Sequence, residues 1–344
     1  MKNRTILMAL CIPQLWFATG CEASFIEDPG NLVPETVSED NTLPQILIND
    51  AKLHSQAFGP VGGLLIICIH GGPGANYRYM LNCISLANNG YRVVFYDQRG
   101  AGLSERFSKK WYTSLGENAV NNIFFDELRE VINYYKVETS QKVILLGHSW
   151  GAMLATGYAG KYPNEIDGLI VAEPGGLVWE DVKEYIKNSR DFSLWSETLN
   201  DAAYIDQFIT GNENQHEILD YKLQLLSSSN EIVGDAESDL GGNVTYYKTP
   251  RDGAVVSAAA FEIGEKYEPD FSDGIAQYRN KVLFVYSSNN KAYPDSWAEK
   301  ISEAYFDKEI FKVQGVGHSG MLDQIDVWSS ITEPKILQYI QSIQ

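Results

Sequence analysis

The residue whose setting most clearly predicts chemistry is Ser149, at the centre of the segment 147–151 (GHSWG). A short apolar run at 142–146 precedes this segment, and a helical pattern at 150–161 follows it. A serine on a sharp turn between a buried strand and a helix projects its hydroxyl above the edge of the sheet. The pattern therefore predicts that Ser149 attacks a carbonyl carbon as a nucleophile.

Acyl transfer to a serine also needs backbone N–H groups that face the negatively charged oxygen of the intermediate. A glycine-rich loop at 70–74 (HGGPG) follows another apolar run, 64–69. We predict that the N–H groups of Gly72 and of Trp150, the residue after the nucleophile, form this oxyanion hole.

The general base is predicted to be a histidine, because such sites follow the chain order serine, acid, histidine. The chain has five histidines, and His318 is the one that follows the last apolar run. The other four lie in an early strand-like stretch, in the two glycine motifs or in the segment 175–270. The segment 315–320 also has the glycine spacing of a dinucleotide-binding loop, but no strand-like run follows it to complete that motif.

The elements that must position these residues are indicated by hydrophobic periodicity. Short, wholly apolar runs are typical of strands buried on both faces of a parallel sheet. Strand-like runs occupy 43–49, 52–58, 64–69, 92–96, 142–146, 169–172, 281–286 and 309–313. Helical patterns near 77–89, 119–136, 150–161 and 324–342 alternate with them. This alternation predicts an α/β fold with a mostly parallel, doubly wound sheet.

One long segment, residues 175–270, interrupts the alternation. It lacks a clear buried strand and contains amphipathic helical stretches at 178–188, 201–209 and 216–226. An insertion of this kind is expected above the carboxyl edge of the sheet, where open α/β folds bind ligands. We therefore expect a core of residues 43–174 and 271–344, with a helical cap of residues 175–270.

The first residues read as a targeting signal. Residues 1–20 combine a short basic start with an apolar stretch too short to span a bilayer, and small residues directly precede Cys21. This arrangement resembles a bacterial lipoprotein signal peptide, which implies a lipid on Cys21 and anchoring in the cell envelope, in the periplasm or at the cell surface. An ordinary cleaved signal and a simple membrane anchor are the alternatives. The acidic residues 21–42 are interpreted as an extended tether.

Composition limits the possible partners. The net charge of −18 over 344 residues argues against binding to nucleic acid phosphates or to an anionic membrane surface. Four cysteines without a CxxC pair argue against a disulfide scaffold or structural zinc. We expect no metal and no cofactor, and contact with a membrane only through the lipid on Cys21.

Three motifs together resemble those of the α/β-hydrolase superfamily, in its proline iminopeptidase-like branch: HGGPG at 70–74, DQRGAGLS at 97–104 and GHSWG at 147–151. The resemblance covers about residues 43–344, apart from the cap. It implies an α/β-hydrolase fold and a serine hydrolase with an acyl-enzyme intermediate. Members of this branch release N-terminal residues, often proline, from peptides. The segment 97–104 is expected to brace the oxyanion loop.

The sequence departs from the family at the acid of the triad. The usual position, after the run at 281–286, is occupied by Asn290. A neutral amide cannot stabilise the imidazolium that forms on the histidine. The protein is then inactive, or Asp295 supplies the carboxylate, or Glu173 does so from the end of the run at 168–173, as in certain haloalkane dehalogenases. We favour Glu173, because the order of serine, acid and histidine is kept.

For an aminopeptidase, the cap must also bind the free ammonium group of the substrate, and Glu262 and Glu265 are the candidates. The leading hypothesis is an exopeptidase acting on small peptides. The alternatives are a carboxylesterase or lipase-like hydrolase of small esters, and an inactive binding protein that retains the fold. Epoxide hydrolase and dehalogenase chemistry is disfavoured, because those enzymes carry an aspartate where this chain has Ser149.

Overall fold

The computed structural model describes residues 32–118, 120–189, 215–226 and 251–343. Its described strands form one eight-stranded sheet in the order β1-β2-β4-β3-β5-β6-β7-β8. β1 and β2 are antiparallel to their neighbours, and every pair from β4 to β8 is parallel. The strands are β1 (Gln45–Ile48), β2 (Ala51–Phe58), β3 (Leu65–Ile69), β4 (Arg92–Tyr96), β5 (Val143–His148), β6 (Gly168–Ala172), β7 (Val282–Ser287) and β8 (Lys308–Val313). The predicted fold class and all eight predicted strands are confirmed.

The burial of the strands explains why their sequences are so apolar. Every residue of β3, β5 and β6 is buried, because helices cover both faces of the central sheet. β8 lies at the edge, and most of its residues are only partly buried, which agrees with its more amphipathic sequence. The apolar runs therefore mark the centre of the sheet.

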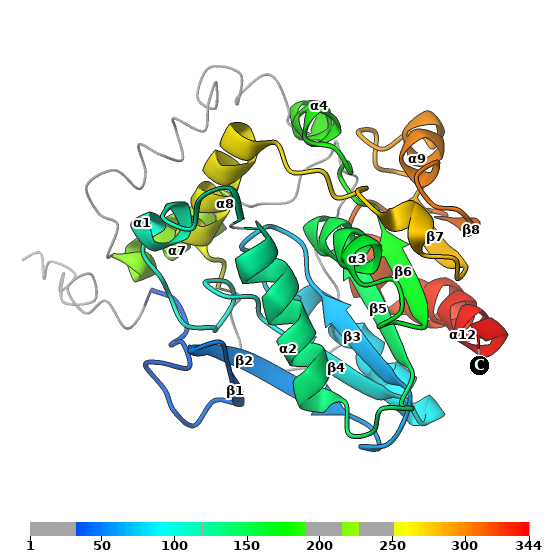
Figure 1. Cartoon of the computed structure of the whole chain (residues 1–344), viewed down its shortest axis with the longest axis horizontal. Helices are drawn as coiled ribbons and strands as arrows, with labels where there is room; N and C mark the ends of the chain where they lie inside the picture. Colours follow the sequence, from blue (N-terminus) through cyan, green and yellow to red (C-terminus); the bar gives the residue numbers. More distant parts are fainter. Residues whose placement is uncertain (1–31, 119, 190–214, 227–250, 344) are drawn as a thin grey trace, which may run out of the picture.

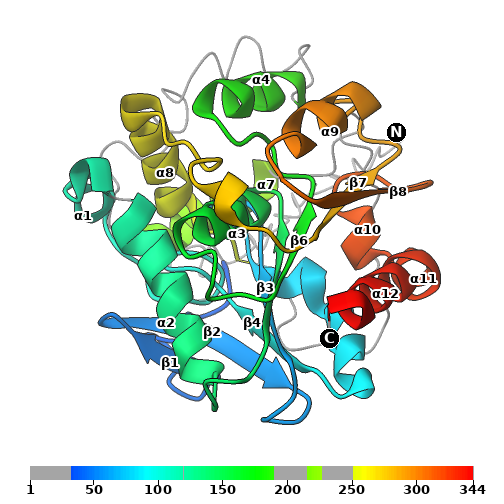
Figure 2. The same cartoon turned by 45° about the vertical axis from the view of Figure 1, so that its right-hand side comes forward.

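Helices form a layer on each face of the sheet. In Figure 2, α2 (Asp126–Tyr135) and α3 (Trp150–Lys161) lie on one side, and α12 (Glu333–Ile343) lies on the other. The face of α12 also carries the 3-10 helix η3 (Tyr77–Asn89), and the two faces hold separate apolar clusters. The shorter helices are α1 (Lys109–Thr113), η4 (Gly116–Asn118), η5 (Val120–Phe125), η6 (Ile275–Gln277), α9 (Asp295–Ser302), α10 (Gly320–Asp323), α11 (Ile325–Val327) and η7 (Trp328–Thr332).

The described part of the predicted cap is helical and consists of α4 (Trp179–Ser189), α7 (His216–Leu226) and α8 (Ala254–Tyr267). The first two coincide with predicted amphipathic stretches, whereas the stretch at 201–209 lies outside the described residues. Figure 1 shows α7 and α8 together beyond one end of the central strands. The N–H of Gly253, at the start of α8, donates to Gly74 O at 2.6 Å, so this helix rests directly on the HGGPG loop.

The end of the predicted tether is not extended. Val33 and Val37 are buried, and the N–H of Val37 donates to Leu103 O at 2.8 Å. Glu39 pairs with the buried guanidinium of Arg251, just before α8. These non-local contacts fold residues 33–40 onto the core. The predicted signal peptide and Cys21 lie outside the described residues, among which no helix has the length and apolar character needed to cross a membrane.

Candidate active site

Ser149 lies between β5 and α3 in a backbone conformation that side chains rarely adopt, with φ of 53° and ψ of −121°. Its N–H donates to Ala172 O at 2.8 Å, which ties the turn to β6. A Cβ atom on Gly147 would lie 2.3 Å from Gly151 O, and one on Gly151 would lie 2.0 Å from Ile69 O. Only glycines allow the strand, the turn and the helix to approach this closely, as expected of a nucleophile turn.

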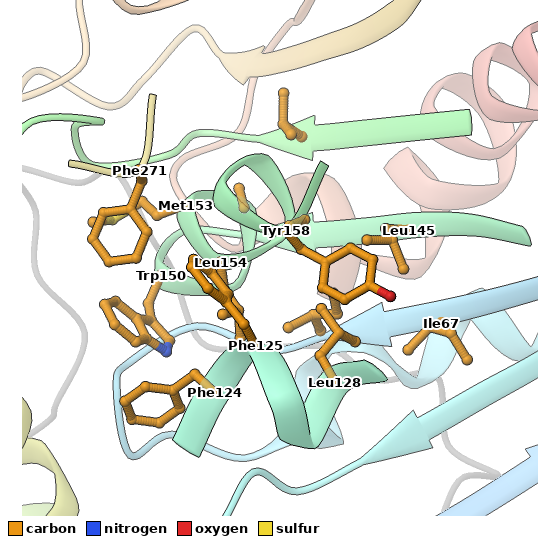
Figure 3. Close-up of a cluster of buried hydrophobic side chains, with 14 of the residues drawn as sticks. Ile67, Phe124, Phe125, Leu128, Leu145, Trp150, Met153, Leu154, Tyr158 and Phe271 are labelled. Carbon is orange, nitrogen blue, oxygen red and sulfur yellow. The ribbon is translucent and has the colours of Figure 1, made fainter. Parts of the chain in front are cut away.

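Aromatic packing fixes the first turn of α3. Figure 3 shows the indole of Trp150 between Phe124 and Phe271, with Met153 and Leu154 on the same helix. The ring centroids of Trp150 and its two neighbours are 5.2 Å and 5.3 Å apart, in edge-to-face geometry. Because Trp150 directly follows Ser149, this packing also holds the serine.

The structure joins His318, which follows β8, to Glu173, which follows β6. Nδ1 of His318 lies 2.5 Å from Oε2 of Glu173, whose side chain is fully buried. The other oxygen, Oε1, accepts hydrogen bonds from the N–H of Ser287 at 2.6 Å and from its hydroxyl at 2.5 Å. A carboxylate on Nδ1 keeps the proton there and leaves Nε2 able to accept one, which is the arrangement of a general base and its acid partner.

Asn290 occupies the family position of the acid and contacts the same carboxylate. Its Nδ2 donates to Glu173 Oε2 at 2.8 Å, and its Oδ1 accepts from the N–H of Ala292 at 3.1 Å. The amide therefore supplies a donor where a second carboxylate would repel Glu173. Asp295 instead starts α9, is largely exposed and pairs with Lys312 at 2.5 Å, a hydrogen bond that lowers its pKa.

The HGGPG loop lies against Ser149, the predicted nucleophile. A Cβ atom on Gly71 would lie 3.1 Å from Cβ of Ser149. Gly72 has φ of 124°, and a Cβ there would lie 2.4 Å from Gly74 N, so the position requires glycine. The N–H groups of Gly72 and Trp150 remain the predicted oxyanion donors.

The segment 97–104 braces this loop, as predicted. Gln98 donates through Nε2 to His70 O at 2.9 Å and accepts from Trp150 Nε1 at 3.0 Å. The N–H of Gln98 donates to Nε2 of His70 at 3.0 Å, so that nitrogen carries no proton. Burial lowers the pKa of His70, which agrees with a neutral ring. One glutamine thus connects the HGGPG loop with Trp150, the residue after Ser149.

Tyr185 is a further residue at the candidate site, and the sequence analysis gives it no role. Its hydroxyl lies 3.4 Å from Nδ1 of His318 and accepts from Asn290 Nδ2 at 3.3 Å. The residue belongs to α4, so a cap helix touches the acid–base pair. Nothing in its spacing distinguishes it from its aromatic neighbours.

The two cap carboxylates proposed for substrate binding have other described partners. Glu262, half-exposed, pairs with Lys109 at 2.9 Å, and Glu265 accepts from Trp179 Nε1 at 3.1 Å. Their role toward an ammonium group stays a prediction. Across the described ranges, no three side chains of the metal-binding types cluster.

Comparison with known proteins shows the family to which the chain is similar. Residues 65–324 match the alpha/beta hydrolase fold family. A proline iminopeptidase of Thermoplasma volcanium is 38% identical over 117 residues, which cover 33% of this chain and 34% of the relative. Proline iminopeptidase PfmaB of Pestalotiopsis fici is 25% identical over 81% of this chain and 94% of its own length. A proline iminopeptidase of Saccharolobus solfataricus is 36% identical over 119 residues, which cover 35% of this chain and 36% of the relative.

A solved structure supports the same assignment of fold. The crystal structure of a proline iminopeptidase from Mycobacterium smegmatis superposes with a TM-score of 0.54 at 17% identity, over 87% of this chain and 99% of the other. The match to the family spans most of the core, and it includes the HGGPG loop, Ser149, Glu173 and His318. The chain therefore belongs to the alpha/beta hydrolase fold family.

Proposed function

We propose that this protein is a serine hydrolase whose triad consists of Ser149, His318 and Glu173. The observation that carries the proposal is the 2.5 Å contact between His318 Nδ1 and the buried carboxylate of Glu173. This contact argues against the alternative of an inactive binding protein, which rested on the neutral side chain at Asn290. The strained turn at Ser149 supports the choice of nucleophile.

In the proposed mechanism, His318 Nε2 takes the proton of the Ser149 hydroxyl as its oxygen attacks the substrate carbonyl. Glu173 stabilises the imidazolium that forms. The N–H groups of Gly72 and Trp150 hold the oxyanion. His318 then gives its proton to the leaving group, and water, activated by the same imidazole, releases the acyl group from the serine.

The substrate class that we propose is a small peptide with a free N-terminus, so that the enzyme acts as an exopeptidase. Support comes from the proline iminopeptidases among its relatives and from the HGGPG, DQRGAGLS and GHSWG motifs. Small esters are the alternative substrates, because the same triad hydrolyses both classes.

Labelling with a fluorophosphonate probe tests the nucleophile. The native protein should react covalently, and Ser149→Ala should not react. The variant Ser140→Ala, at an exposed serine in the loop before β5, serves as the matched control and should still be labelled. Labelling of Ser149→Ala at the native rate would reject the assignment. Rates on prolyl-naphthylamide and on p-nitrophenyl acetate, measured side by side, then separate the peptidase from the esterase.

We further propose that Cys21 carries a lipid that anchors the protein in the bacterial cell envelope. The support is the apolar stretch and the small residues that precede Cys21. Expression in a bacterium fed a clickable fatty acid should label the native chain but not Cys21→Ala. Cys68→Ala, at a buried cysteine of β3, is the control and should keep the label. Equal labelling of Cys21→Ala would contradict the anchor.

A further inference from the structure

A second set of hydrogen bonds joins the loops that carry the predicted catalytic groups. The N–H of Gly71 donates to the hydroxyl of Tyr79 at 2.7 Å, and this hydroxyl lies 2.8 Å from Nδ1 of His148. Nε2 of His148 lies 2.9 Å from the backbone carbonyl oxygen of His318. The path therefore runs from the oxyanion loop, through η3 and the nucleophile turn, to the backbone of the general base.

The partners of His148 determine the direction of each hydrogen bond. A carbonyl oxygen only accepts, so Nε2 of His148 carries the proton that it donates to His318. Burial and the nearby charge of His318 lower the pKa of His148 far below its usual value, so its ring is neutral. Nδ1 is then an acceptor, and the Tyr79 hydroxyl donates to it while accepting from Gly71. Every bond in the path has one donor and one acceptor.

This path holds one of the two peptide groups that meet at Gly71, and the other peptide group carries the predicted oxyanion donor. The N–H of Gly71 is held by Tyr79, and the carbonyl oxygen of Gly71 lies 2.8 Å from Nδ1 of His70, which donates to it. Within a planar trans peptide, the N–H points opposite to the carbonyl. Holding Gly71 at both groups therefore sets the direction of the Gly72 N–H.

We propose that Tyr79 and His148 are positioning residues that keep the oxyanion loop and the loop of the general base in register around Ser149. The inference rests on the proposed function. Neither side chain has to touch the substrate, because both act through the backbone of Gly71 and His318. Loss of the Tyr79 hydroxyl should therefore weaken binding of the transition state more than binding of the ground state.

The variant Tyr79→Phe tests the proposal, because it removes one hydroxyl and keeps the ring. Reaction with a fluorophosphonate probe also develops negative charge in the oxyanion hole. The maximal rate of inactivation should fall at least about tenfold, whereas the probe concentration giving half that rate should stay within about twofold. A merely structural hydroxyl would change stability without this separation.

Tyr339→Phe is a matched control, because its hydroxyl contacts the start of β6, away from the end of this strand where Glu173 lies. Its buried ring carries a hydroxyl that likewise accepts from a backbone N–H, that of Leu169 at 2.9 Å, and donates to Lys281 O at 2.7 Å. This variant should lose stability and keep the native labelling rate. If Tyr79→Phe slows labelling no more than Tyr339→Phe does, the proposal is wrong.

Two variants of His148 give an independent result. His148→Gln keeps an N–H donor that can reach His318 O, and its labelling rate should stay within about tenfold of the native rate. His148→Leu loses both bonds and should fall to the level of Tyr79→Phe. A native labelling rate for His148→Leu would overturn the proposed positioning role and leave the proposed function standing. Failure of the probe to label the native protein would instead overturn the proposed function, and this inference with it.

Discussion

At the scale of single residues, the three residues that we propose as a triad were predicted on different grounds. Glycine spacing identified Ser149, and chain order identified His318. Glu173 was reached because Asn290 stands at the usual position of the acid. The hydrogen bond from the Asn290 amide to Glu173 was not predictable, because the two residues lie 117 positions apart and only the pairing of β6 with β7 brings them together.

Asn290→Asp should disturb the site through charge. The new carboxylate would lie within about hydrogen-bond distance of Glu173, so the pKa of one of the two groups rises. When both are ionised, their added negative charge raises the pKa of His318. Both effects move the acid limb of the pH profile of kcat/KM to higher pH. Asn289→Asp adds the same charge at an exposed neighbour and should leave the limb in place; equal profiles for both variants would contradict the account.

At the scale of elements, the strand-like runs of the sequence predicted every strand that the structure describes, whereas the type of each helix was not predicted. The expected helix at 119–136 is the π-helix η5 followed by α2, and the expected helix at 77–89 is the 3-10 helix η3. The 3-10 helix and the π-helix pair each backbone carbonyl with a different N–H than the α-helix does. The spacing of hydrophobic residues does not distinguish these hydrogen-bond patterns.

The nucleophile turn depends on close approach between elements. Gly151→Ala would place a Cβ atom 2.0 Å from Ile69 O. The backbone would have to move to relieve this clash. We expect loss of most hydrolase activity and destabilisation of about 2 kcal/mol or more, measured by urea denaturation. Gly62→Ala is the control, because its Cβ would meet no atom within 4 Å. A fully active, stable Gly151→Ala protein would refute the tight packing described for β3 and α3.

At the scale of the whole molecule, buried charges connect the cap to the core. Asp220 of α7 accepts from Nε of Arg106 and from Nε of Arg251, both at 2.9 Å. Arg251 also pairs with Glu39, 212 positions away. Residues 21–42 were predicted to be an extended tether because of their acidic composition. Composition does not reveal that an arginine far away in the sequence binds one of these acidic residues.

Asp220→Ala should destabilise the protein by about 3 kcal/mol, because it leaves two buried guanidinium groups without their shared carboxylate. Urea denaturation measures this change. Glu180→Ala removes the partner of Lys183 at an exposed site and should cost less than about 1 kcal/mol. Similar losses for the two variants would show that the network does not hold the cap.

The junction of cap and core should also respond to pH through Asp252. Burial raises its pKa from 3.8 to about 6, and its Oδ1 accepts from Asn76 Nδ2 at 2.8 Å. Below about pH 4, the carboxyl is protonated in folded and unfolded chains alike. As pH rises from about 4 to about 6, the unfolded chain loses this proton while the folded protein keeps it, so stability falls. Above about pH 6 the penalty on folding is complete, at roughly 3 kcal/mol.

Asp252→Asn keeps an oxygen for Asn76 and cannot ionise. Its free energy of unfolding should exceed the native value at pH 8 and match it at pH 4, measured by urea denaturation at both pH values. The exposed Asp50, replaced by Asn, should show little difference at either pH. Stabilisation of Asp252→Asn that is equal at pH 4 and pH 8 would contradict the raised pKa.

The most direct test of the triad compares the rates of acyl transfer for the two rival acids. Glu173→Gln keeps the shape of the buried side chain but cannot stabilise the imidazolium, so kcat should fall by roughly 10³- to 10⁴-fold. Asp295→Asn, which alters an exposed group paired with Lys312, should stay within about twofold of the native rate. A large loss in Asp295→Asn together with near-native turnover in Glu173→Gln would contradict the triad described here.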